Sequence, residues 1–77
     1  MSESSNPQPA LGAAIRELRI AREKTQEAAA QGADITVAHL SKIERGLTNP
    51  TWGTVKAIAE ALGVSITDLA KLSEKHE

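Results

Sequence analysis

Apolar residues recur every three or four positions along most of this chain, the spacing that places them on one face of a helix. Leu11, Ile15 and Leu18 show it first and predict a helix over about residues 10–23. The same spacing returns between residues 55 and 72, and no segment shows the alternation of a half-buried strand. The pattern therefore predicts an all-α fold.

Threonines and glycines mark where these helices begin and end. Three threonines stand where a hydroxyl can cap a helix N-terminus: Thr25, Thr36 and Thr51. Gly46 and Gly63 can take the left-handed conformation that ends a helix. A further helix opens at Thr67 and runs to about residue 75. We therefore expect five short helices, the second and third joined by a turn at residues 32–35.

The stretch from Thr25 to Gly46 is the most informative part of the sequence. It combines two short helices, a tight turn, a capping threonine before the second helix and a closing glycine. This is the layout of a helix-turn-helix, whose second helix enters the major groove of DNA. The stretch therefore points to double-stranded DNA as the partner.

The ends of the chain differ from its middle. Residues 1–9 are polar and include two prolines, so we expect a disordered tail before a single domain over residues 10–77. The last helix, at about residues 67–75, offers a dimer contact together with Val64 and Ile66. Residues 14–56 are net basic and the remainder net acidic, within a formal net charge of −1. This weak electrostatic footprint predicts modest DNA affinity per monomer and favours a homodimer.

Composition excludes several other classes of protein. The chain has no cysteine, and its two histidines, His39 and His76, are far apart, so we expect no disulfide, no metal site and no cofactor. No apolar run reaches the roughly 20 residues that cross a bilayer, and the N-terminus lacks a signal-peptide profile. We expect a soluble cytoplasmic protein that does not bind membranes.

Several short motifs, in their order and spacing, resemble the Cro/lambda-repressor-type, or Xre-like, family of DNA-binding domains. The resemblance covers residues 11–70 and is carried by residues 15–19, TQE at 25–27, LSKIERG at 40–46, NPT at 49–51 and IAEALGVS at 58–65. It implies a compact five-helix domain whose helices two and three form the helix-turn-helix, similar to small stand-alone regulators such as restriction–modification controller proteins. It also implies a structural salt bridge between Arg19 and Glu44 that ties helix one to helix three.

The chain departs from the family pattern in and around helix two, at Glu23, Lys24, Ala29 and Asp34. An alanine in place of a core leucine typically loses about 2–5 kcal/mol unless neighbours fill the space, and Trp52 is the candidate to fill it. Aspartate in a left-handed turn is strained relative to glycine, so Gly32 is the alternative turn residue.

The third helix divides into a buried face and a face that can read DNA. Leu40 and Ile43 point to the core, which leaves four candidate base-contacting residues: Val37, Ala38, Ser41 and Lys42. Apolar groups at the helix start suit thymine methyls, and the lysine can donate to guanine. The alternatives are apolar residues exposed without a function and a solvated lysine.

Candidate phosphate-contacting residues surround this helix, assigned partly by resemblance to the family: Gln26, Thr36, His39, Arg45, Thr48, Asn49 and Thr51. Free N–H groups at the starts of helices two and four suit a phosphate. The alternatives are that Gln26 is only a helix former, that Arg45 only interacts with the negative end of its own helix, and that His39 is inert.

Three classes of function compete. The first is a sequence-specific transcriptional regulator that binds an inverted-repeat operator as a homodimer. The second is the antitoxin of a toxin–antitoxin pair, in which the same fold also holds a protein partner. The third is an enzyme, for which we find no catalytic motif, no phosphate-cradling glycine loop and no paired carboxylates. We therefore predict no catalytic residues and favour the regulator.

Overall fold

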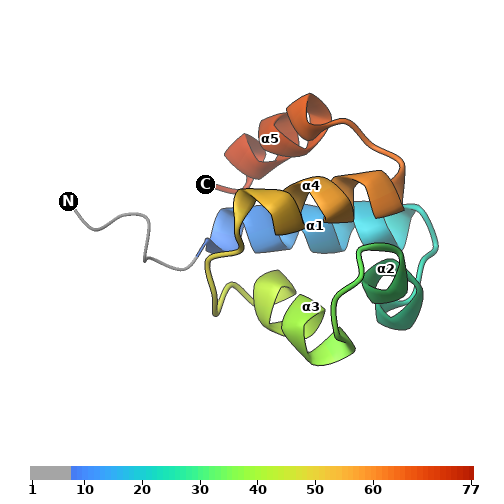
Figure 1. The fold of residues 1–77 in the computed structure, drawn as a ribbon. Coiled ribbons are helices and arrows are strands. Elements are labelled where there is room, and N and C mark those ends of the chain that lie inside the picture. The colour runs from blue at the N-terminus through green and yellow to red at the C-terminus, as the bar shows by residue number, and fades with distance from the viewer. Residues whose placement is uncertain (1–7) are drawn as a thin grey trace.

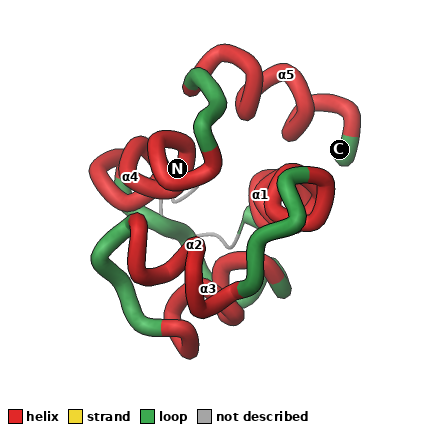
Figure 2. The backbone as a smooth tube through the Cα atoms, turned by 90° about the vertical axis from the view of Figure 1, so that its right-hand side faces the viewer, coloured by secondary structure: helices red, strands yellow, loops and turns green. Residues whose placement is uncertain are grey.

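Five α-helices and no strand make up residues 8–77, the part of the chain that the computed structural model describes. The helices are α1 (Pro9–Ala21), α2 (Gln26–Gly32), α3 (Val37–Glu44), α4 (Trp52–Leu62) and α5 (Ile66–Lys75). α1 and α4 form the middle of the molecule, with α5 on one side and α2 and α3 on the opposite side (Figure 1 and Figure 2). The predicted all-α, five-helix fold is confirmed.

Side-chain caps start three of these helices where the sequence placed them. The hydroxyl oxygens of Thr25, Thr36 and Thr51 accept the backbone N–H three residues further on, at 3.0, 3.0 and 3.2 Å. Gly46 and Gly63 both have φ of 72° beyond the ends of α3 and α4. Each cap satisfies an N–H group that has no partner within its helix, so the local sequence defines these boundaries.

The start of α1 differs from the expectation that the tail extends through residue 9. Pro9 is the first helical residue, a position that suits proline because the N–H it lacks would have no partner there. The backbone N–H of Gln8 donates to the carbonyl of Thr48 at 3.4 Å. Gln8 and Pro9 therefore belong to the folded part, and residues 1–7 of the predicted tail lie outside the described residues.

The start of α5 also differs from the expectation. The hydroxyl of Ser65 accepts the backbone N–H of Asp68 at 3.0 Å, so Ser65 is the cap and Ile66 begins the helix. The prediction that Thr67 opens this helix was wrong by one residue, because serine caps at least as well as threonine and comes first.

The core lies where α1 meets the other helices. Its largest fully buried side chains come from four of the five helices: Ile15, Leu40, Ile43, Ile58, Leu62 and Leu69. α1 crosses α3 at Gly12, where an added Cβ would overlap the carbonyl oxygen of Ile43. Only glycine permits this approach, which fixes α3 against α1 and orients its opposite face outward.

The small side chain of Ala29 is accommodated by a close approach of two helices. A Cβ on Gly32 would lie 3.0 Å from the Cβ of Ala61, so α2 comes close to α4 at this point. Ala29 is buried, whereas Trp52 is 65% exposed. The prediction that Trp52 fills the space was wrong, because Trp52 is largely exposed, and small residues on α2 and α4 let these two helices approach closely instead.

Two residues with side chains adopt the left-handed conformation between helices. Asp34 has φ of 59° in the turn after α2, and Glu23 has φ of 57° after α1, which ends at Ala21 instead of residue 23. Gly32 stays within α2 and does not have a positive φ. The alternative in which Gly32 serves as the turn residue was therefore wrong.

Candidate nucleic-acid interface

The turn between α2 and α3 holds the two helices in a fixed relation. The backbone N–H of Asp34 donates to the carbonyl of Gln31 at 3.1 Å, and that of Ile35 to the carbonyl of Ala30 at 3.0 Å. Ile35 is half-buried against the core. These contacts direct the start of α3 away from α2, which is the geometry of a helix-turn-helix.

The outer face of α3 is accessible along its length. Leu40 and Ile43 are fully buried on the inner face. On the outer face, Ser41 is half-buried and the other predicted contact residues are exposed: Val37, Ala38, Lys42 and Arg45. A short apolar surface at the helix start is thus followed by a hydroxyl and two cations, which can contact thymine methyls, base edges and phosphates in that order.

Arg45 bonds to its own helix in this structure. Its Nε lies 3.4 Å from the carbonyl oxygen of Ser41, in the last turn of α3. This geometry matches the alternative in which the guanidinium interacts with the negative end of its own helix. Because Arg45 is exposed and a guanidinium carries five N–H donors, a phosphate remains a compatible second partner.

The carboxylate of Glu44 is the centre of a buried polar cluster. Its side chain is 1% exposed, and it accepts hydrogen bonds from Arg19 Nε at 2.7 Å and Arg19 Nη2 at 3.1 Å. The family-implied pair is therefore present as a bidentate ion pair that ties α1 to α3.

Gln26 adds a third contact that the sequence did not indicate. Its Nε2 donates to Glu44 Oε1 at 3.1 Å, so the first residue of α2 is tied to the last residue of α3. No local pattern could reveal this bond, because the two residues are far apart in sequence. The amide nitrogen carries two hydrogens, which leaves a second donor compatible with a phosphate.

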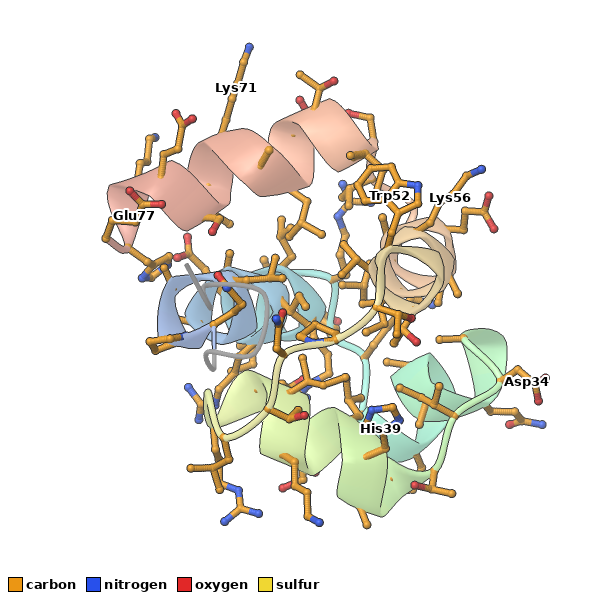
Figure 3. All side chains as sticks on the ribbon, turned by 60° about the vertical axis from the view of Figure 1, so that its left-hand side comes forward. Asp34, His39, Trp52, Lys56, Lys71 and Glu77 are labelled. Carbon is orange, nitrogen blue, oxygen red and sulfur yellow. The ribbon has the colours of Figure 1, made fainter. Side chains whose placement is uncertain are left out.

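The remaining predicted phosphate contacts divide between α3 and the α3–α4 connection. Thr36 is the exposed cap of α3, and His39 is half-buried on the same helix (Figure 3). Thr48 and Asn49 are half-buried before α4. The Thr51 hydroxyl accepts from the backbone N–H of Thr54 at 3.2 Å and donates to the Thr54 hydroxyl at 3.0 Å, so its hydrogen is already engaged in this structure.

A metal-binding cluster and a membrane-spanning helix are both missing from the described part of the chain. Among residues 8–77, no three His, Asp or Glu side chains come together in a way that could hold a metal ion. None of the helices within that range has the length and apolar character needed to span a membrane.

Comparison with known proteins identifies the family. The helix-turn-helix family model matches residues 15–69, which include all of α2, α3 and α4. The chain belongs to the helix-turn-helix family. The Xre-like resemblance expected from the sequence is thereby confirmed.

One curated relative and two solved structures illustrate the similarity. The HTH-type transcriptional regulator DdrOP3 of Deinococcus deserti is 40% identical over 55 residues, which cover 71% of this chain and 43% of the relative. The clp gene regulator ClgR from C. glutamicum has a TM-score of 0.87 at 27% identity, with 92% of this chain and 94% of that chain covered.

The second structure is the restriction–modification controller protein C.Esp1396I, solved as a tetramer in complex with its natural 35-base-pair operator. It has a TM-score of 0.83 at 25% identity, with 90% of this chain and 91% of that chain covered. This chain therefore spans nearly all of these solved structures but less than half the length of the Deinococcus relative.

Proposed function

We propose that this chain binds duplex DNA in a sequence-specific way and regulates transcription. The observation that carries the proposal is α3, whose inner face is buried while Val37, Ala38 and Lys42 on its outer face are exposed. Major-groove recognition needs a helix held in this way. Membership of the helix-turn-helix family and the operator complex of C.Esp1396I support the same partner.

In this proposal four side chains face the bases: Val37, Ala38, Ser41 and Lys42. The phosphates are held by the groups around α3: Gln26, Thr36, His39, Arg45, Thr48, Asn49 and Thr51. The Arg19–Glu44 ion pair acts indirectly, because it sets the position of α3 against α1. The proposed role is binding without catalysis, in the cytoplasm.

We further propose that two copies bind an inverted repeat. One short α3 reads only a few base pairs, and the formal net charge of −1 provides little non-specific attraction. Two α3 helices on half-sites about 34–36 Å apart would supply the missing affinity. The tetrameric assembly of C.Esp1396I on its operator supports such an arrangement.

Selection from a random duplex library, followed by titration of the selected sequence against a shuffled control, tests the function. We expect a two-fold symmetric sequence that binds roughly a thousandfold more tightly than the control at physiological salt. A failure to enrich any sequence would contradict sequence-specific DNA binding and favour a role in binding protein, as in an antitoxin.

Ala38→Asp tests the assignment of α3 as the reading helix. Ala38 is exposed at the second position of α3, where a carboxylate is compatible with the helix dipole and repels DNA. We expect loss of specific binding with little change in the melting temperature. Unchanged binding would show that α3 does not face the bases.

A further inference from the structure

Lys24 lies in the short link between α1 and α2, and both polar groups of its backbone are bonded to one residue. Its N–H donates to the carbonyl oxygen of Arg19 at 3.0 Å, and its own carbonyl oxygen accepts from Arg19 Nη1 at 2.8 Å. Lys24 is nevertheless exposed. The link therefore holds the backbone of Lys24 in place and leaves its ammonium group accessible.

The rest of the link is bonded to its surroundings as well. The backbone N–H of Glu23 donates to the carbonyl oxygen of Ile20 at 2.9 Å. Arg22 Nη1 donates to the carbonyl oxygens of Leu62 and Gly63 at the end of α4, at 3.2 and 3.4 Å. A side chain carried by such a fixed link loses little backbone freedom when it binds a partner, which favours affinity.

The guanidinium that holds Lys24 also determines the position of Gln26. Arg19 Nε and Nη2 donate to the Glu44 carboxylate, which also accepts from Gln26 Nε2 at 3.1 Å. One ion pair thus fixes the backbone of Lys24 and the side chain of Gln26 relative to each other. Two residues of chain span at most about 7 Å, so an ammonium and an amide are held side by side here.

The charge of Lys24 is not neutralised by the acidic residues beside it. Glu23 and Glu27 are its neighbours in sequence, and both are exposed. Among residues 8–77 the structure has two ion pairs, and Lys24 takes part in neither of them. Lys24 is also a position at which the chain departs from the family pattern, so this cation is a property of this chain.

The link lies on the side of the molecule that would face DNA. It runs from α1 to α2, on the side that holds α2 and α3 (Figure 1). The bond from Gln26 to Glu44 places the start of α2 beside the last residue of α3. A duplex whose major groove takes the outer face of α3 would therefore bring backbone phosphates to the link, where an ammonium and an amide N–H suit a phosphate oxygen.

We propose that Lys24 is a further DNA-contacting residue, whose ammonium binds the same backbone phosphate as the amide of Gln26. We call these two residues the α2 clamp. Arg19 and Glu44 are positioning residues, because they act through the two members of the clamp. The inference deepens the proposed function and rests on it, since it concerns how the same duplex is held.

Titration of the whole chain with the selected and the shuffled duplex tests the contact. Lys24→Gln should weaken both duplexes alike. Its loss of affinity should shrink roughly 3.5-fold between about 50 and 200 mM salt, because one lost phosphate contact removes about 0.9 from the slope of log K against log salt concentration. Lys24→Arg keeps the charge and should keep the slope. Lys71→Gln is the matched control, since it removes a charge from α5 on the opposite side (Figure 1).

A double-variant cycle tests whether the two side chains share one phosphate. Lys24→Gln removes the cation and Gln26→Ala removes the amide donor. Groups that hold one phosphate are coupled, so the double variant should lose less affinity than the product of the two single losses. Lys24→Gln should melt near the wild-type temperature, because the residue is exposed and its bonds to Arg19 use only its backbone.

An unchanged salt slope in Lys24→Gln would overturn the inference, and so would a changed sequence preference, which would indicate a contact to a base. Single losses that simply multiply in the double variant would overturn the shared phosphate. If the wild-type chain binds neither duplex, the proposed function fails and the inference fails with it. If the wild-type chain binds DNA and Lys24→Gln binds it equally well, only the inference fails.

Discussion

Glu23 and Asp34 are held in a left-handed backbone conformation that side chains disfavour. Their φ angles are 57° and 59°, and each follows the end of a helix, α1 or α2. A residue with a Cβ typically loses about 1–2 kcal/mol in this region, and aspartate loses less than most. These two residues therefore carry backbone strain within the helix-turn-helix and just before it.

We expect Glu23→Gly to raise the free energy of unfolding by about 0.5–1 kcal/mol, with a smaller gain for Asp34→Gly, since the entropy lost by glycine offsets part of the relief. Urea denaturation of the variants measures the change. Gly46→Ala should act in the opposite direction, because φ is 72° there and the new Cβ would lie 2.7 Å from the Cα of Pro9. Destabilisation by Glu23→Gly would contradict the strain argument.

The ion pair of Arg19 with Glu44 also affects the free energy of unfolding. The Glu44 side chain is 1% exposed, so removing its cation leaves a buried carboxylate without a counter-ion. Arg19→Met should lower stability by about 3–5 kcal/mol. Adding Glu44→Leu should recover part of this loss, because the uncompensated charge is then gone. Thermal unfolding compares the stability of Arg19→Met with that of the double variant. A double variant less stable than Arg19→Met would refute the prediction.

The effect of adding a side chain at a glycine depends on what surrounds that glycine, and Gly12 and Gly53 are opposite cases. Gly12 lies where α1 touches the backbone of α3, and an added Cβ would overlap the carbonyl oxygen of Ile43. Gly53 lies in the first turn of α4 with no atom within 4 Å of an added Cβ. The same substitution should therefore have opposite effects at these two positions.

We expect Gly12→Ala to cost about 1–3 kcal/mol, the typical loss when a well-packed contact is overpacked. Gly53→Ala should stabilise the chain by up to about 1 kcal/mol, because alanine has the higher helix propensity. Calorimetry of each variant measures the change in its free energy of unfolding. Gly12→Ala should also weaken DNA binding, since α3 would have to move away from α1. Equal effects of the two substitutions would contradict the packing described above.

The distribution of charge over the whole molecule sets how DNA binding responds to salt. Lys42 and Arg45 are exposed on the outer face of α3, whereas Lys71 lies on α5 at the opposite side (Figure 1). Each cation that neutralises a phosphate adds about one to the slope of log K against log salt concentration.

Arg45→Gln should thus reduce that slope by about one and weaken all duplexes alike. Lys71→Gln carries the same loss of charge and should leave the slope nearly unchanged. Titrations of a selected and a shuffled duplex at several salt concentrations provide the comparison. A change in the preferred sequence of Arg45→Gln would instead indicate a contact to a base.

Local signals were sufficient to predict the helices and most of their ends. Thr25, Thr36 and Thr51 cap the helices that they were expected to cap, because the capping bond joins residues three apart and needs no distant partner. The start of α5 was misplaced because Ser65 and Thr67, two residues apart, are both good caps. The inner face of α3 was equally predictable, since helical spacing alone separates Leu40 and Ile43 from the exposed residues.

The sequence by itself therefore determined the five helices, the helix-turn-helix layout and the division of α3 into an inner and an outer face, because these depend on bonds and spacings within a few residues. Only the tertiary structure decided that Gln26 bonds to Glu44, that α2 approaches α4 closely, and that Trp52 is exposed beside α5. Each of these depends on how closely helices far apart in sequence can pack. That distance is set by side-chain volumes on both partners at once, and no local pattern contains it.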